Sequence, residues 1–352
     1  MDSMEIDYLI IGQGLAGSLL AWELIQRQKK IIIVDNAKEN ASLMAAGLIN
    51  PVTGMRWVKS ENVDLLLPVA LAYYQKLARH FQQQFYVEKT LRRVISTEKD
   101  LAAAKKRQQQ IAYQPYLSQN IGVDSTLYAP WGLINQKQTG YLLCKPLLTA
   151  LKSYFIAHHA YIKAEINYQD IHLSQQLHWK KWRPKHIIFC EGHHATHNPW
   201  FSWLPFQPVK GEIITATATQ AIPQTILNYG HWFIPLSTYQ FRTGATFDRI
   251  QLDTQISTAA KETLLTSLKK VMPTLSINPE IRQEAGIRPT TLDKQPFIGH
   301  HPKHPELIIF NGFGAKGSLQ IPWYCQCLAN NLMYNQAIPE NSHIMRYASL
   351  SL

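Results

Sequence analysis

A glycine-rich turn near the N-terminus constrains the fold of this chain more than any other feature. Residues 8–11 form a short apolar run, typical of a strand that is buried on both faces. Gly12, Gly14 and Gly17 follow in G-x-G-x-x-G spacing, and apolar residues then recur with helical periodicity. The pattern predicts a strand, a tight turn and a helix. In such units the second glycine leaves room for a pyrophosphate and the third lets helix and strand pack closely.

A second apolar strand, predicted at residues 31–34, ends in Asp35, which lies 18 residues after Gly17. In βαβ units that bind dinucleotides, an acidic residue at about this distance binds a ribose hydroxyl. The N–H groups at the start of the helix complete a site for the pyrophosphate. The carboxylate disfavours a 2′-phosphate, and therefore NADP, which leaves FAD and NAD as candidates. The alternative is a βαβ unit that binds nothing.

The composition limits the classes of protein to which this chain can belong. The chain has 352 residues, 46% of them hydrophobic, which is enough for one large domain or two joined ones. We expect no transmembrane helix and no signal peptide, and four scattered cysteines favour a reduced, cytoplasmic setting without a metal site. The net charge of +11 fits RNA or a membrane surface as a partner, or simply a basic surface.

Further segments extend the predicted architecture. Residues 186–192 predict another parallel strand, which ends at Gly192. Residues 211–219, 232–237 and 239–247 alternate in the manner of an antiparallel sheet. Helices are predicted at 63–83, 97–112, 145–159, 258–271 and 318–334.

A second strand–glycine–helix junction lies near the C-terminus. A strand predicted at 307–310 runs into Gly312, Gly314 and Gly317, and a helix follows. This junction would offer N–H donors and a helix N-terminus to the negative charge that develops on the N1–C2=O edge of a flavin. NAD-linked dehydrogenases do not need such a second junction. The pair of junctions therefore favours FAD.

With these motifs the chain resembles the FAD-dependent amino acid and amine oxidases, which include glycine oxidase, D-amino acid oxidase and sarcosine oxidase. The resemblance covers essentially the whole length. It is carried by residues 7–17 with Asp35, by 42–51, by 286–299 and by 311–322. These segments are similar to the family's pyrophosphate and ribose site, its small-residue stretch, its Gly-x-Arg-Pro signature and its flavin-closing glycine loop. They are specific to the superfamily and not to one substrate.

The resemblance implies noncovalent FAD, because Pro289 and Thr290 stand near the place where covalent sarcosine oxidases carry a cysteine. Two positions depart from the family: Phe313 and Ala315 flank Gly314 where relatives often have an aromatic residue or histidine, and Asp35 replaces a common glutamate. The residues implied in FAD binding are Gly12, Gly14, Leu15, Ala16, Gly17, Asp35, Asn36, Ala46, Gly47, Gly192, Gly312, Gly314, Ala315, Lys316, Gly317 and Ser318.

The fold implied is α/β: a Rossmann-like FAD-binding domain and a discontinuous α+β substrate domain built on an antiparallel sheet. We assign residues 1–62, 140–207 and 284–352 to the FAD-binding domain. Residues 63–139 and 208–283 are assigned to the substrate domain.

Arg288 matches the arginine that pairs with the substrate carboxylate in glycine oxidase-like enzymes. The physics agrees, because a guanidinium fork binds a carboxylate bidentately and keeps its charge in a closed site. The alternative is an arginine that bridges the two domains. Lys316 lies near the position of a basic residue in the glycine oxidase loop, so Arg288 and Lys316 are the candidate catalytic residues. Tyr229, His231 and Arg242 are further candidates for binding substrate.

The activity implied is oxidation of the C–N bond of an amine or amino acid by hydride transfer to flavin, followed by imine hydrolysis. Electrons would pass to oxygen or to another acceptor such as a quinone. Two alternatives stay open. One is a tRNA wobble-uridine oxidase that removes a carboxymethyl group from a modified base, with tRNA as the partner. The other is a non-catalytic flavoprotein subunit.

Overall fold

The computed structural model describes residues 3–38, 40–54, 56–173 and 176–350, and the chain divides into two units. The first unit comprises Met1–Leu43, Cys144–Val209 and Ile287–Leu352. The second comprises Met44–Leu143 and Lys210–Gly286. Each unit is thus assembled from segments that are far apart in the sequence.

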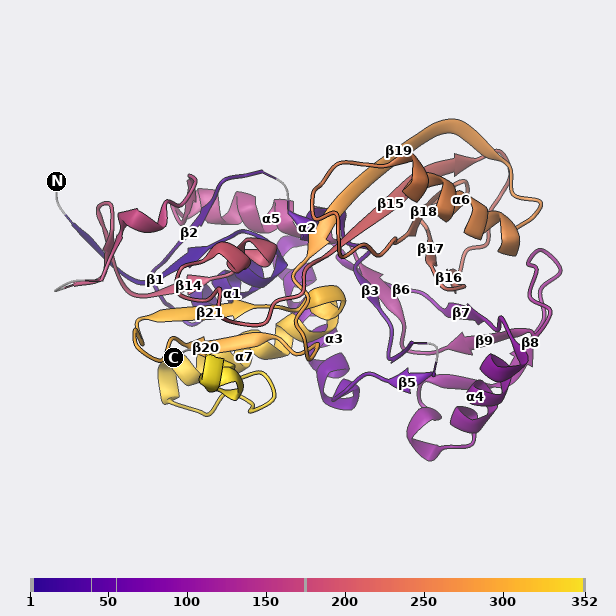
Figure 1. Cartoon of the computed structure of the whole chain (residues 1–352), viewed down its shortest axis with the longest axis horizontal. Helices are drawn as coiled ribbons and strands as arrows, with labels where there is room; N and C mark the ends of the chain where they lie inside the picture. The colour runs from indigo at the N-terminus through magenta and orange to yellow at the C-terminus, as the bar shows by residue number, and fades with distance from the viewer. Residues whose placement is uncertain (1–2, 39, 55, 174–175, 351–352) are drawn as a thin grey trace. The chain divides into compact units, whose positions relative to one another are not determined.

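Five parallel strands form the centre of the first unit. Their order is β11-β2-β1-β14-β21, and β20 pairs antiparallel with β21 (Figure 1). The elements of this unit are β1 (Met4–Ile11), α1 (Leu15–Gln26), β2 (Ile31–Asp35), α2 (Ala41–Met44), α5 (Cys144–Ala157), β11 (Tyr161–Lys163), β12 (Ile171–His172), β13 (His178–Trp179), β14 (Trp182–Phe189), β20 (Phe297–His300), β21 (Leu307–Asn311) and α7 (Gly317–Tyr334), with 3₁₀ turns at Tyr168–Asp170, Gly192–His197, Gly314–Lys316 and Ile344–Leu350.

Both faces of this parallel sheet are buried, which explains the continuous apolar runs in its strands. On one face, Leu9, Ile11 and Phe189 pack into a core that also contains Phe201 and Ile344. The helix α1 contacts both α5 and α7. The strands predicted at 8–11, 31–34, 186–192 and 307–310 are all neighbours in this sheet.

The second unit is built on an eight-stranded sheet of order β19-β15-β18-β17-β16-β7-β9-β8, with a three-stranded sheet β3-β10-β6 and the hairpin β4–β5 (Figure 1). Its elements are β3 (Leu48–Ile49), β4 (Val52–Thr53), β5 (Val58–Lys59), α3 (Val63–Phe81), β6 (Tyr86–Glu88), β7 (Leu91–Val94), α4 (Glu98–Gln108), β8 (Leu117–Gly122), β9 (Leu133–Gln136), β10 (Gly140–Leu142), β15 (Val209–Ala218), β16 (Ile226–Asn228), β17 (Trp232–Pro235), β18 (Gln240–Gly244), α6 (Thr258–Val271) and β19 (Ile277–Arg288), with a 3₁₀ turn at Ile111–Tyr113.

The two faces of the large sheet pack against different elements of the second unit. On one face, Phe233 and Phe241 pack with Leu268 and Val271 of α6. On the other, a smaller core of Leu91, Ile226 and Ile234 includes Tyr141 of β10. The antiparallel pairing of β15, β17 and β18 follows the alternation predicted for these segments.

The structure places residues 44–62 in the second unit, whereas the sequence assigns them to the FAD-binding domain. The cause is pairing with distant strands: Leu48 and Ile49 pair with β10. Trp57 is buried, donates a hydrogen bond to Asp100 Oδ1 at 2.6 Å, and stacks under the guanidinium of Arg93. The sequence of residues 44–62 contains no local pattern that predicts these long-range contacts.

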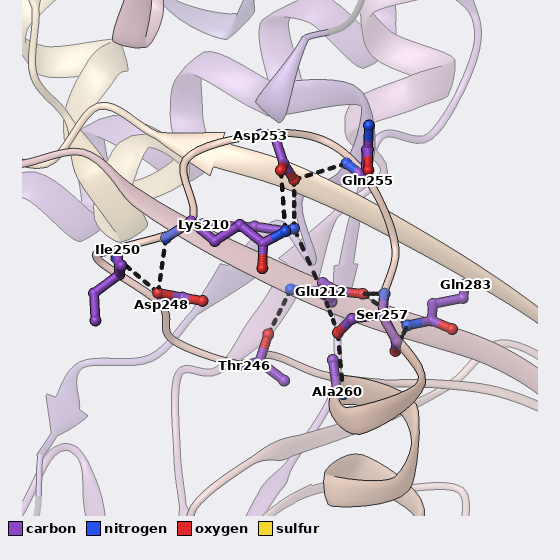
Figure 2. A network of polar contacts seen from close by, with 11 residues as sticks. Lys210, Glu212, Thr246, Asp248, Ile250, Asp253, Gln255, Ser257, Ala260 and Gln283 are labelled. Atoms are coloured by element: carbon purple, nitrogen blue, oxygen red, sulfur yellow. Dashed lines mark hydrogen bonds and ion pairs between the residues drawn. The ribbon is translucent and has the colours of Figure 1, made fainter.

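A polar network anchors a long loop of the second unit, residues 245–257, to the start of β15 (Figure 2). Lys210 and Asp248 exchange backbone hydrogen bonds of 2.8 and 3.0 Å. Glu212 accepts hydrogen bonds from both the backbone N–H and the hydroxyl of Ser257, each at 2.9 Å. Since Ser257 is the N-cap of α6, the network also fixes where that helix begins.

Candidate functional site

The predicted cofactor segments of the first unit gather along one edge of its parallel sheet. In sheet order, Asp35 ends β2, Gly12 follows β1, Gly192 follows β14, and Gly312 follows β21. The chain leaves β1 for β2 on one side and later returns to β14 on the other, which makes this a topological switch point. Ligands of open α/β sheets bind outside the carboxyl ends of the strands at such a point.

The three positions of the first turn need glycine for different physical reasons. Gly12 has a φ of +104°, and a Cβ there would lie 2.5 Å from Cys190 O. A Cβ on Gly17 would lie 1.9 Å from Gly12 O. A Cβ on Gly14 would make ordinary contacts, 3.4 Å from Ser42 Oγ and 3.6 Å from Asn40 Oδ1, and the φ of Gly14 is −72°. Protein packing therefore requires Gly12 and Gly17 but not Gly14. The space at Gly14, beside the N-terminus of α1, fits the close approach of a pyrophosphate.

Side chains hold this turn in place. Asp35 Oδ2 accepts a hydrogen bond from Gln13 N at 2.8 Å, and Asp35 Oδ1 accepts one from Ala37 N at 2.7 Å. Leu15 N donates to Ser42 Oγ at 3.0 Å. A carboxylate has about four acceptor positions, so Asp35 can serve the backbone and a ribose hydroxyl together. Asn36 Oδ1 accepts a hydrogen bond from Lys38 N at 3.0 Å and shapes the next turn.

A buried carboxyl group at the end of β14 was not singled out from the sequence. Glu191 accepts hydrogen bonds from the Tyr168 hydroxyl and from Asn198 Nδ2, both at 2.8 Å. Burial raises the pKa of Glu191 to about 7, and the two hydrogen bonds only partly oppose the shift. The sequence feature that could have identified Glu191 is an acidic residue directly after an apolar strand. Gly192 follows in the left-handed region, with a φ of +60°.

The Arg-Pro signature lies against the C-terminal glycine loop. Gly314 N donates to Pro289 O at 3.3 Å, and a Cβ on Gly312 would lie 2.7 Å from Thr291 Cγ2. Gly312 and Gly314 have φ values of +83° and +53°. The structure thus brings together two segments of the first unit that the sequence indicated separately.

This contact places the two candidate catalytic residues in neighbouring segments. Arg288 directly precedes Pro289, and burial lowers the pKa of its guanidinium, which still stays charged at neutral pH. Lys316 is the N-cap of α7, and Gly317 and Ser318 form the first turn of that helix. Ala315 is exposed within the loop. A cation beside a helix N-terminus and glycine turns makes a region suited to bind anionic groups.

The three candidates of the second unit do not share one face of its sheet. The Tyr229 hydroxyl bonds to Thr243 Oγ1 at 2.7 Å, on the face that α6 covers, and burial raises the pKa of Tyr229 to about 12. Arg242 precedes Thr243 in β18, so it points to the opposite face, where its Nε donates to Thr215 Oγ1 at 3.3 Å. His231 Nδ1 lies 3.2 Å from Ala245 O.

Two further predicted cofactor residues, Ala46 and Gly47, also belong to the second unit. Ala46 packs against the core around Tyr141. Gly47 has a φ of +66°, and a Cβ there would lie 2.1 Å from Leu142 O. Packing against β10 therefore accounts for Gly47 without a ligand.

The described parts of the chain contain neither a cluster of metal-binding side chains nor a membrane-spanning helix. Within those residues, no group of three or more His, Cys, Asp or Glu side chains could hold a metal ion. Among the helices of the described ranges, none is long and apolar enough to cross a membrane.

Comparisons with known proteins agree with this geometry. The family description of FAD dependent oxidoreductases matches residues 7–331. The structure of glycine oxidase from Geobacillus kaustophilus has a TM-score of 0.82 and 20% identity, covering 97% of this chain and 99% of that one. Iminodiacetate oxidase from Chelativorans sp. BNC1 has a TM-score of 0.78 and 18% identity, covering 96% and 98%. These two likenesses show a shared fold.

One curated relative combines this similarity with a longer chain. It is the tRNA 5-methylaminomethyl-2-thiouridine biosynthesis bifunctional protein MnmC of Marinobacter nauticus, which is 21% identical over 94% of this chain. The chain spans 56% of the length of that protein. The family match covers most of the chain and includes both glycine junctions and the Arg-Pro segment. The chain therefore belongs to the FAD dependent oxidoreductase family and is an oxidoreductase enzyme whose cofactor is FAD.

Proposed function

We propose that this enzyme oxidises the C–N bond of an amine that carries a carboxylate on the carbon next to nitrogen. The observation that carries the proposal is the position of Arg288, a partly buried cation in the segment that packs against the C-terminal glycine loop. Both similar structures are named for such molecules, glycine and iminodiacetate. In each of them a carboxylate and an amine nitrogen are attached to the same carbon.

The residues of this chain would bind and orient the substrate. Bound FAD would supply the redox chemistry by accepting a hydride from the carbon between nitrogen and carboxylate. Arg288 would hold both carboxylate oxygens through its planar fork and so fix the direction of that C–H bond. Lys316 would add positive charge at the start of α7. Bidentate binding restricts rotation more than a point charge does, and this favours arginine at position 288.

In the second unit, Arg242 is the better candidate for a substrate contact. Its Nε is held by Thr215, which leaves the guanidinium oriented on the face of the sheet that α6 does not cover. Tyr229 has its hydroxyl engaged with Thr243 on the α6 face. We therefore propose Arg242, before Tyr229 and His231, as the group of the second unit that contacts the substrate.

A second candidate function is the oxidation of a modified wobble uridine in tRNA. The similarity to MnmC over 94% of the chain favours it, together with the net charge of +11. A carboxymethylamino group on a base contains the same N–CH2–carboxylate unit as glycine. The same role for Arg288 would therefore serve both candidates, and the two differ in what the nitrogen carries.

Anaerobic titration of the purified enzyme would test the proposal. We expect glycine, N-methylglycine or iminodiacetate to bleach the visible flavin absorbance, whereas methylamine, which lacks the carboxylate, should not. Bleaching by methylamine as fast as by glycine would contradict the role of the carboxylate. If no small amine reacts but tRNA with a carboxymethylaminomethyl base does, the second candidate is the function. In that case binding should weaken steeply with salt.

A further inference from the structure

Asn311, the last residue of β21, joins the turns that follow two adjacent parallel strands. Its side chain is buried, with 2% of the residue exposed. Asn311 Nδ2 donates to Gly192 O at 2.8 Å, and Gly312 N donates to Asn311 Oδ1 at 2.8 Å. One side chain thus serves the turn after β14 and the glycine loop after β21.

The backbone pairing of β14 with β21 does not extend to these two turns. The pairing of β14 with β21 ends at Phe189 and Ile309. Beyond that pair, Gly192 begins a 3₁₀ turn and Gly312 a glycine loop, both in the left-handed region, so the strand pairing does not continue. Buried backbone N–H and C=O groups need partners, and the Asn311 amide supplies one of each.

The turn after β14 is itself held firmly. Glu191, which precedes Gly192, accepts hydrogen bonds from Tyr168 and Asn198. Asn198 is fully buried, and its Oδ1 accepts from Trp200 N and Phe201 N. Asn311 therefore connects the glycine loop to a part of the unit that is fixed from several sides.

We propose that Asn311 is a positioning residue for the FAD-facing loop Gly312–Gly317, which it ties to the Glu191–Gly192 turn. The proposal rests on FAD binding along this edge of the sheet. Without the tie, Gly312 N would lose the Asn311 acceptor and Gly192 O would lose the Asn311 donor. The loop and the start of α7 would then be free to shift, and their N–H groups would be less well aligned with the negative charge of reduced flavin.

Three variants of the holoenzyme test this. Asn311→Leu keeps the approximate shape and removes both hydrogen bonds. Asn311→Asp keeps an acceptor for Gly312 N but places an acceptor against Gly192 O. Asn331→Leu is the matched control, because Asn331 Nδ2 also bonds to a backbone carbonyl, that of Gln336, at 2.8 Å. Asn331 lies about 20 Å from the start of α7 along the helix axis, at 1.5 Å per residue.

The readouts are the FAD dissociation constant, the fine structure of the bound flavin spectrum and the midpoint potential. We expect Asn311→Leu to weaken FAD binding at least tenfold and to lower the midpoint potential. Asn311→Asp should weaken binding less, and Asn331→Leu should stay within twofold of wild type. If Asn311→Leu does not fold, Asn311→Asp carries the comparison.

The outcomes separate this proposal from the proposed function. Wild-type affinity and potential in both Asn311 variants would overturn the positioning role and leave the proposed function intact. Weakened FAD binding by an equal factor in Asn331→Leu would also overturn it, because the effect would then be general. Wild-type protein that binds FAD yet oxidises no carboxylate amine would overturn the proposed function and leave the Asn311 comparison valid.

Discussion

The ammonium nitrogen of Lys210 lies 2.6 Å from Asp253 Oδ1, although only 2% of the Lys210 side chain is exposed. The same nitrogen lies 3.8 Å from Glu212 Oε1. Lys210 is therefore a buried cation between two carboxylates, one on its own strand and one on the 245–257 loop (Figure 2). Buried charges persist only when paired in this way.

Lys210→Met should destabilise the second unit, because Glu212 would keep its charge in the interior without a cation. We expect the free energy of unfolding to fall by about 1–3 kcal/mol, because the Glu212 carboxylate would lose its cation while it keeps the hydrogen bonds from Ser257. Lys59→Met is the matched control, since Lys59 pairs with Asp64 at 2.6 Å and the Asp64 side chain is 63% exposed. That surface pair should contribute less than about 1 kcal/mol. Urea denaturation of both variants measures the difference, and equal losses would contradict the assignment.

Protein packing requires glycine at position 17 but not at position 14, so alanine should have different effects at the two positions. Gly14→Ala should fold and lose FAD, because within the protein the added methyl group makes only ordinary contacts, with the side chains of Ser42 and Asn40. Gly17→Ala should destabilise the fold by about 1–3 kcal/mol or more, since the methyl group would overlap Gly12 O. Circular dichroism measures folding, and the absorbance ratio of flavin to protein measures occupancy. A yellow Gly14→Ala protein with wild-type FAD content would exclude the pyrophosphate from this turn.

The proposed role of Arg288 in binding the substrate carboxylate can be tested with variants of the enzyme and with substrates that have or lack a carboxylate. Arg288→Ala should retain FAD and raise the KM for carboxylate substrates roughly 30- to 1000-fold, which corresponds to about 2–4 kcal/mol for a lost charge pair. Arg288→Lys should recover only part of the loss, because lysine keeps the charge but not the bidentate geometry. Steady-state kinetics with glycine and methylamine separate the carboxylate effect from a general one. An unchanged KM for glycine in Arg288→Ala would rule out the anchor.

Glu191 should make stability depend on pH. Its pKa is about 7 in the folded protein and 4.5 as the ordinary value, so the folded state holds an extra proton between these values. The free energy of unfolding therefore falls as pH rises from about 4.5 to 7, by at most about 3 kcal/mol. The contribution of the neutral carboxyl group is fully present below pH 4.5 and is lost above pH 7.

Glu191→Gln isolates this effect, because the amide mimics the neutral carboxyl group. Relative to wild type, the variant should become more stable as pH increases through the window from 4.5 to 7. Buried histidines such as His186, whose pKa is lowered to about 4, act in the opposite direction but are common to both proteins. Chemical denaturation at pH 5, 6, 7 and 8 gives the difference curve. A flat curve would mean that Glu191 titrates in its ordinary range.

The strands and glycine turns along this edge of the sheet could be predicted because their sequence signals are local. A strand, a glycine turn and a helix are consecutive in the chain, so Gly12, Gly14 and Gly17 and the later Gly312 and Gly314 could be read without tertiary information. The FAD-dependent family and the α/β fold followed from these junctions. The sheet order along this edge confirms that the predicted strands are neighbours.

Long-range pairing explains what the sequence could not provide. Nothing near Trp57 indicates that it stacks with Arg93, so residues 44–62 could not be assigned from their own pattern. Tyr229 and Arg242 both looked suitable for one pocket, but the face of each depends on strand register. Asn311 reads as an ordinary turn residue until Gly192, 119 positions away, is seen beside it.

The discontinuous build of the first unit has a consequence for synthesis. The chain passes between the units after residues 43, 143, 209 and 286. The strand β21 is synthesised long after β14, yet it lies beside β14 in the sheet. On the ribosome, the nascent chain would therefore carry the first glycine turn long before the edge is complete. Capture of FAD along this edge would have to wait until β21 and the loop after it have emerged.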